Sequence, residues 1–411
     1  MAKLPAALLI ASSLVATSCA EGPAPRPFSA RDSAGVRIVM SQAPVASSPW
    51  TLDILPSAEI GADASDTMQV LFRVSDGTVL EDGSIVLATG AAPMLRWFDE
   101  QGQYVQGTGR QGGGPGEFGS AHGARIQWLW PLGDSVATWE HAERRMQVFG
   151  PEARYSRMLQ LEPPTDPGSY PQLVGPIGEG FLAFLLEMRP PGVLGAVERD
   201  PIRFVRYGPD GKFSNQVFEG LGYSYITYLW KRPDGTEDKT RGRPPFSRNP
   251  VAAVGNERLY FADNEAYSIA VLTPEGTLQS FIRRPELGRA LTTEMVEAYK
   301  AASLAGAPED PEVRRRWKET LDDAVYPEYL PWIRQMLIDR IGMLWVQEYV
   351  PQTALEATWS VFDPSDGHWL GDIVLPMAWQ VLEVGADYVL AVVPDDFDVE
   401  RVRRYALYRS K

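Results

Sequence analysis

Apolar and polar residues alternate along most of this chain, and turn sequences interrupt the alternation at short intervals. Segments 204–218 (FVRYGPDGKFSNQVF) and 270–282 (AVLTPEGTLQSFI) have alternating apolar residues on both sides of a centre rich in Asp, Pro and Gly. Such alternation predicts two half-buried strands, and the central residues predict the turn that joins them. The same hairpin pattern recurs at 95–109, 146–161 and 360–375. The pattern therefore predicts an all-β protein.

A second pattern, a turn followed by a strand, precedes each of these hairpins. It occurs at 80–90, 131–140, 176–187, 253–263 and 339–349, and a further copy at 383–396 is followed by a final strand at 404–409. Repeated units of a few strands, each about 40 or more residues long, predict a β-propeller, here with six blades over residues 50–411. The last unit lacks an outer strand. We expect the alternating segment 50–61 to supply that strand and so close the ring.

Helical periodicity replaces the alternation at about 285–336. Thr292 is the predicted N-cap of one helix, and Asp310 is the predicted N-cap of a second helix that has Pro311 at its first position. Three apolar residues of the second helix would share one face: Val313, Trp317 and Leu321. We therefore expect a helical insertion between late blades, which either covers a binding site or only elaborates the packing.

The stretch GTGRQGGGPGEF, at 107–118, is the most glycine-rich part of the propeller sequence. Gly107 to Gly112 fit the dinucleotide fingerprint G-x-G-x-x-G, but that motif needs a helix directly after it. The following glycines and Pro115 do not allow a helix to begin there, so phosphate binding is not expected. We expect a structural loop, in which Glu117 forms a salt bridge and Phe118 is buried.

These residues and the next hairpin carry a resemblance to a known family. The loop residues concerned are Gly109, Arg110, Gly112, Gly114, Pro115, Gly116, Glu117 and Phe118, and those of the hairpin are Arg145, Gln147, Val148 and Phe149. They resemble the NHL-repeat family of six-bladed β-propellers and its bacterial lipoprotein relatives, in which GxxGxGPGEF leads from one blade to the next. Glu140 and Glu143 stand where that family has Asp and Asn.

The N-terminus, MAKLPAALLIASSLVATSCA, resembles an export signal, because one Lys precedes a short apolar run. The run is too short to span a membrane, for which a helix needs about 20 apolar residues. Cys19, the only cysteine, occupies the position of the acylated cysteine in a lipobox, although Ala16 replaces the usual Leu. We expect a lipoprotein-type signal at 1–19 and a flexible tether at 20–49, with plain cleavage after Ala16, Ser18 or Ala20 as the alternative.

Export would place the protein in the cell envelope, anchored to the outer membrane through Cys19 or otherwise periplasmic or secreted. The formal net charge of −14 argues against nucleic acid, which is bound mainly through Lys and Arg. The chain has no G-x-S-x-G elbow, and lipidation of Cys19 would leave no thiol for catalysis. The three histidines, His122, His141 and His368, lie in separate repeats without the spacing of zinc ligands.

Two further sets of residues are candidates for a site. Six-bladed lactonases and NHL-type lyases hold a divalent cation in the channel, and the corresponding acidic and amide candidates here are Glu81, Asp82, Glu140, Asp263, Asn264 and Glu348. Two aromatic runs could stack on sugars or pack between blades: Tyr223, Tyr225, Tyr228 and Trp230, and Trp128 with Trp130. The cluster Asp395-Asp396-Phe397-Asp398 lacks the glycine and the terminal glutamate of an EF-hand loop, and we expect it to cap a hairpin.

Together these observations favour a monomeric binding propeller that recognises an envelope protein, a peptide or a glycan. No catalytic residue and no metal ligand set is assigned, and Ca²⁺ is the one cofactor considered. The alternative is a divalent-metal-dependent lactonase or lyase with its site in the central channel.

Overall fold

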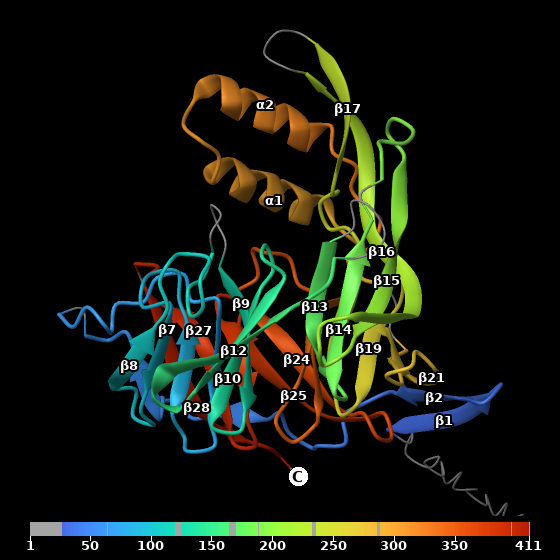
Figure 1. Cartoon of the computed structure of the whole chain (residues 1–411). Coiled ribbons are helices and arrows are strands. Elements are labelled where there is room, and N and C mark those ends of the chain that lie inside the picture. Colours follow the sequence, from blue (N-terminus) through green and yellow to red (C-terminus); the bar gives the residue numbers. More distant parts are fainter. Residues whose placement is uncertain are drawn as a thin grey trace, which may run out of the picture.

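The computed structural model describes residues 27–63, 65–119, 125–163, 170–187, 189–231, 236–285, 288–395 and 397–410. The chain folds as a β-propeller with a small helical insertion, so the all-β class predicted from the alternation is confirmed (Figure 1). The described strands form six sheets, which we number in chain order from the strand that begins at Asp76. The signal segment 1–19 and Cys19 lie outside the described residues.

The first three sheets follow one another along the chain. Sheet 1 contains β5 (Asp76–Val79), β6 (Ile85–Ala88), β7 (Leu95–Phe98) and β8 (Tyr104–Thr108). Sheet 2 contains β9 (Ile126–Leu132), β10 (Ser135–Glu140), β11 (Arg145–Gly150) and, after the short 3-10 helix η1 (Pro151–Ala153), β12 (Arg154–Gln160). Sheet 3 contains β13 (Tyr170–Ile177), β14 (Gly180–Leu186), β15 (Val197–Tyr207), β16 (Phe213–Lys231) and β17 (Glu237–Gly242).

Sheets 4 and 6 also contain strands from the N-terminal part of the chain, and sheet 5 lies next to that part. Sheet 4 contains β18 (Val251–Gly255), β19 (Arg258–Ala262), β20 (Ser268–Leu272) and β21 (Leu278–Arg283), followed by β2 (Val36–Ser41) and β1 (Phe28–Ser33). Sheet 5 contains β22 (Ile333–Ile338), β23 (Leu344–Glu348), β24 (Glu356–Asp363) and β25 (His368–Pro376). Sheet 6 contains β26 (Gln380–Val384), β27 (Tyr388–Pro394) and β28 (Glu400–Tyr408), and β28 pairs with β3 (Thr51–Leu52) and β4 (Ala58–Ile60).

The core consists of separate apolar clusters between successive sheets. Sheets 1 and 2 share one cluster, sheets 2 and 3 the next, and the succession continues to a cluster shared by sheets 6 and 1. The last of these includes Ile60 from β4 together with Ile85 from sheet 1 and Val402 from sheet 6. Each sheet therefore buries both of its faces against neighbours, which explains the near-continuous apolar runs in many strands.

The N-terminal residues 28–60 run along the outer edges of three sheets. Strand β2 pairs in parallel with β21, the outer strand of the four that begin sheet 4. The amides of Val45, Ala46 and Trp50 then donate to backbone carbonyls of β25, before β3 and β4 pair with β28. The predicted flexible tether over 20–49 is therefore wrong for residues 28–41. These residues complete the hydrogen bonds of an otherwise open sheet edge and bury Val39.

The helical insertion consists of α1 (Thr293–Ala305) and α2 (Pro311–Asp322), which lie between β21 and β22. Both predicted caps are present: Thr292 Oγ1 accepts from Met295 N, and Asp310 accepts from two amides of the first turn. Only Leu321 of the predicted apolar face is buried, since Val313 and Trp317 are exposed. No helix among the described residues is long and apolar enough to cross a membrane.

Strands β15 and β16 extend beyond the ring on the side that carries the helices (Figure 1). Strand β16 is 19 residues long, and its distal part, from Ile226 to Lys231, pairs with β17. The loop after β17 contacts the helical insertion, because the ring of Phe246 lies 5.0 Å from that of Tyr299. We call the distal parts of β15 and β16 together with β17 the projection.

Candidate functional site

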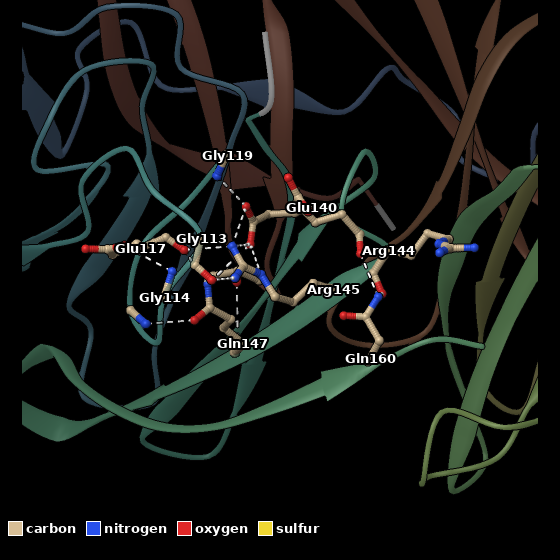
Figure 2. A network of polar contacts seen from close by, with 12 residues as sticks. Gly113, Gly114, Glu117, Gly119, Glu140, Arg144, Arg145, Gln147 and Gln160 are labelled. Atoms are coloured by element: carbon tan, nitrogen blue, oxygen red, sulfur yellow. Dashed lines mark hydrogen bonds and ion pairs between the residues drawn. The ribbon is translucent and has the colours of Figure 1, made fainter. Parts of the chain in front are cut away.

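The glycine-rich loop is held on sheet 2 by a network of buried polar side chains (Figure 2). Arg145 on β11 donates to the carbonyls of Gly113 and Glu117 and forms an ion pair of 2.9 Å with Glu140. Gln147, two residues further along the same strand, donates to the Glu117 carbonyl and accepts from Gly116 N. The side chains of Arg145 and Glu140 are 5% and 0% exposed, so this network is shielded from water.

The rest of the loop is fixed from within. Glu117 forms a salt bridge of 2.8 Å with Arg110 and accepts from Gly114 N, and these two contacts hold the pKa of Glu117 below its usual value. Phe118 is fully buried, and its ring lies against Phe149. Gly109 has a φ of 88°, and any Cβ there would lie 2.5 Å from the Phe118 ring. The residues of the NHL-like motif therefore join sheet 1 to sheet 2, and most of their polar groups bond within the loop or to sheet 2.

The acidic and amide candidates for a metal site do not come together. No group of three or more His, Cys, Asp or Glu side chains that could hold a metal occurs in the described part of the chain. Glu140 binds Arg145, Glu348 forms an ion pair of 2.7 Å with Arg284, and Asn264 binds backbone groups of sheet 5. These side chains therefore serve contacts within the protein. His141 and His368 contact Gln172 and Asp366 respectively, and His122 lies outside the described residues.

A different carboxyl group, that of Asp76, lies between the inner strands of sheets 1 and 2. Asp76 begins β5, and its two oxygens accept from Leu129 N on β9 at 2.7 Å and from Gly77 N at 2.9 Å. The residue is 8% exposed, and burial raises the pKa of its carboxyl to about 8. Burial therefore favours the protonated form of this carboxyl, while the hydrogen bonds from Leu129 N and Gly77 N favour the ionised form.

Four other residues are linked to Asp76 through its neighbours in the chain or through the residues that it contacts. Gln380, the first residue of β26, donates to the carbonyl of Ser75, and Trp128 directly precedes Leu129 on β9. Phe72 precedes β5 and carries the guanidinium of Arg73 at 5.0 Å from its ring centre. We call Phe72, Arg73, Asp76, Trp128 and Gln380 the Asp76 mouth.

The Asp76 mouth combines exposed aromatic rings with polar groups. Trp128 and Phe72 are 44% and 51% exposed, so both rings are accessible to a partner. Arg73 is exposed, has a φ of 50° and forms no ion pair with any described residue. Strained backbone of this kind is concentrated at binding sites. The arrangement can stack on a flat apolar face and hydrogen-bond to its edges.

Sequence reasoning named Trp128 but missed Asp76, Arg73 and Gln380. Asp76 lies in the segment SDGTVLEDG, in which Asp beside Gly is typical of a turn, and its burial depends on a strand 50 residues away in sequence. The other aromatic candidates divide between two roles. Trp130 packs against the cluster between sheets 2 and 3, whereas Tyr225 lies under Arg241 of β17 and Tyr223 under Arg243, which directly follows β17. The side chain of Trp230 lies outside the described residues.

No family model and no curated protein matches the chain. Among solved structures, the chain is similar to an exported protein from Bacteroides fragilis, with 11% identity, 90% of this chain and 98% of that chain covered, and a TM-score of 0.47. It is also similar to a member of the DUF4221 family from Bacteroides vulgatus, with 10% identity, 87% and 98% covered, and a TM-score of 0.47. A virginiamycin B lyase from Staphylococcus aureus has 13% identity, 87% and 99% covered, and a TM-score of 0.38. Similarity at this level transfers no activity, so the site is argued from its own residues.

Proposed function

We propose that this chain is an exported binding protein that recognises a glycan or a peptide of the cell envelope at the Asp76 mouth. The observation that carries the proposal is the exposure of Trp128 on the inner strand β9, next in sequence to Leu129, whose amide donates to the buried Asp76. An exposed indole on a rigid inner strand loses little entropy on binding and stacks on a sugar ring or a peptide side chain. Arg73 and Gln380 then supply donors and acceptors that orient the bound partner.

Binding is favoured over metal-dependent hydrolysis or elimination because the described residues gather no ligand set for a divalent cation. The N-terminal sequence supports export, and Cys19 is the proposed site of lipid attachment. Labelling of cells with a radioactive fatty acid tests the anchor. The label should enter the wild-type protein and be absent from Cys19→Ser, and equal labelling of both would refute it.

The binding proposal is tested with the mature domain, residues 22–411, against panels of envelope glycans and of short peptides. A ligand that binds the wild type should lose at least about tenfold in affinity on Trp128→Ala, since stacked aromatic residues dominate such interfaces. The matched control is Trp317→Ala, because Trp317 is also an indole, is 45% exposed and lies on α2, outside the Asp76 mouth. Ligands bound equally by wild type, Trp128→Ala and Arg73→Ala would place the recognition surface elsewhere and refute this proposal.

A further inference from the structure

Two cations, Lys239 and Arg241, lie at alternate positions of β17, and a third, Arg243, directly follows the strand in the sequence KTRGR at 239–243. Lys239 and Arg241 share one face of the strand, and Arg243 lies over Tyr223 as Arg241 lies over Tyr225, so the three form one strip. Strand β17 is the last strand of sheet 3, and no described residue pairs with its outer edge. The strip therefore lies beside a row of backbone donors and acceptors that no described strand uses.

The central cation of the strip is held in place. Arg241 makes two hydrogen bonds to Asp200, at 2.8 and 2.9 Å, and its guanidinium lies 4.5 Å from the ring centre of Tyr225. Both partners of this ion pair are nearly buried. Bidentate pairing of this kind fixes the orientation of the guanidinium. Arg241 thereby ties β17 to β15 and keeps the strip rigid.

The two flanking cations are free to contact a partner. The guanidinium of Arg243 lies 3.9 Å from the ring centre of Tyr223, and Arg243 is exposed. Stacking engages a face of the guanidinium, and one hydrogen bond joins it to the Tyr223 side chain, which leaves its other N–H groups for a carboxylate. Lys239 is also exposed, and within the described part of the chain neither Lys239 nor Arg243 has an acidic partner within ion-pair distance. The lack of an acidic partner for these two cations is notable because acidic residues outnumber basic residues in this chain, which has a net charge of −14.

We propose that the strip of Lys239, Arg241 and Arg243 binds an extended acidic segment of a partner protein, which adds to the sheet as a strand alongside β17. Strand addition uses the open backbone edge, and carboxylates at every second residue of the partner would meet the strip. Charged residues on an edge strand normally prevent other strands from pairing. The same charges select a partner of the opposite sign. This surface is separate from the Asp76 mouth and does not depend on the function proposed for it.

The test is fluorescence anisotropy with the mature chain and a labelled peptide that has Glu at alternate positions between Thr and Val. Wild type should bind this peptide, and binding should weaken with salt. The double variant Lys239→Glu and Arg243→Glu should lose at least about tenfold in affinity, because like charges would then face one another. Arg37→Glu is the matched control, since Arg37 is equally exposed but lies on β2, far from β17 (Figure 1).

A second measurement separates loss of binding from loss of folding. A peptide with Lys in place of each Glu should bind the double variant better than it binds wild type, which an unfolded protein would not do. Methylation of alternate backbone amides of the Glu peptide should abolish binding if the peptide adds as a strand. The proposal is overturned if wild type fails to bind the peptide, or if Arg37→Glu weakens binding as much as the double variant. It is also overturned if the methylated peptide or an acidic polysaccharide binds equally well, since charge alone would then suffice.

Discussion

The titration of Asp76 should determine part of the pH dependence of stability. Burial raises the pKa of this carboxyl from 3.8 to about 8. The unfolded chain releases the proton near the ordinary value, whereas the folded chain keeps it until about pH 8. Between these values the unfolded state binds fewer protons than the folded state. The free energy of unfolding therefore falls as the pH rises through this range and levels off above it.

The size of the effect follows from the pKa. One pKa unit corresponds to about 1.4 kcal/mol, so ionisation of Asp76 should cost about 4 kcal/mol between about pH 5 and pH 8. Asp76→Asn removes the titration, while the amide oxygen still accepts from Leu129 N. The wild-type protein should thus be most stable relative to the variant at low pH, and should lose about 4 kcal/mol of that advantage by pH 8.

The assay is urea unfolding of both proteins at several pH values across this range. All other titrating groups are common to the two proteins, so their contributions cancel in the difference. If the stability of wild type and of Asp76→Asn depended on pH in the same way, the raised pKa of Asp76 would be refuted. Such a result would show that the amides of Leu129 and Gly77, which both stabilise the ionised form, outweigh the effect of burial.

Two further predictions concern contacts between sheets and are also measured by urea unfolding. Glu140→Ala should lower the free energy of unfolding by about 3–5 kcal/mol, because the substitution leaves Arg145 buried without its partner. The control, Arg110→Ala, removes an exposed ion pair and should change the free energy of unfolding by about 1 kcal/mol or less. Ile60→Ala should cost about 2–5 kcal/mol, since Ile60 is fully buried where β4 packs on sheet 1. Ile54→Ala, at a residue that is 91% exposed, should cost no more than about 0.5 kcal/mol. Equal losses within either pair of variants would contradict these assignments.

Features that depend on residues close in sequence could be predicted from the sequence. Thr292 and Asp310 cap helices because each side chain reaches amides only two or three residues away. The hairpins were predicted because turn residues and alternation occur together within about 15 residues. The position of Phe118 in the core follows from local anchoring of the glycine-rich loop in the same way.

Features that depend on distant pairing could not be predicted. Residues 28–35 are mostly small or polar, as is typical of a tether, whereas VRIVMS at 36–41 has the alternation of a strand, whose partner, β21, lies about 240 residues away in sequence. The pKa of Asp76 depends on burial by an adjoining sheet, and no local pattern reports that burial. The extension of β16 beyond the ring could not be predicted either. Alternation shows that a strand continues, but it does not show whether an adjacent sheet covers that strand.

Trp128 and Trp130 show what decides between core and site in a propeller. They lie two residues apart on β9, so alternation places them on the same face of the strand. Trp130 nevertheless packs between sheets 2 and 3, whereas Trp128 remains 44% exposed. Lys239 on β17 is likewise exposed on the projection, where the sheet extends past its neighbours. The two surfaces proposed for binding therefore lie where a regular strand pattern continues beyond the part of the ring that adjacent sheets can bury.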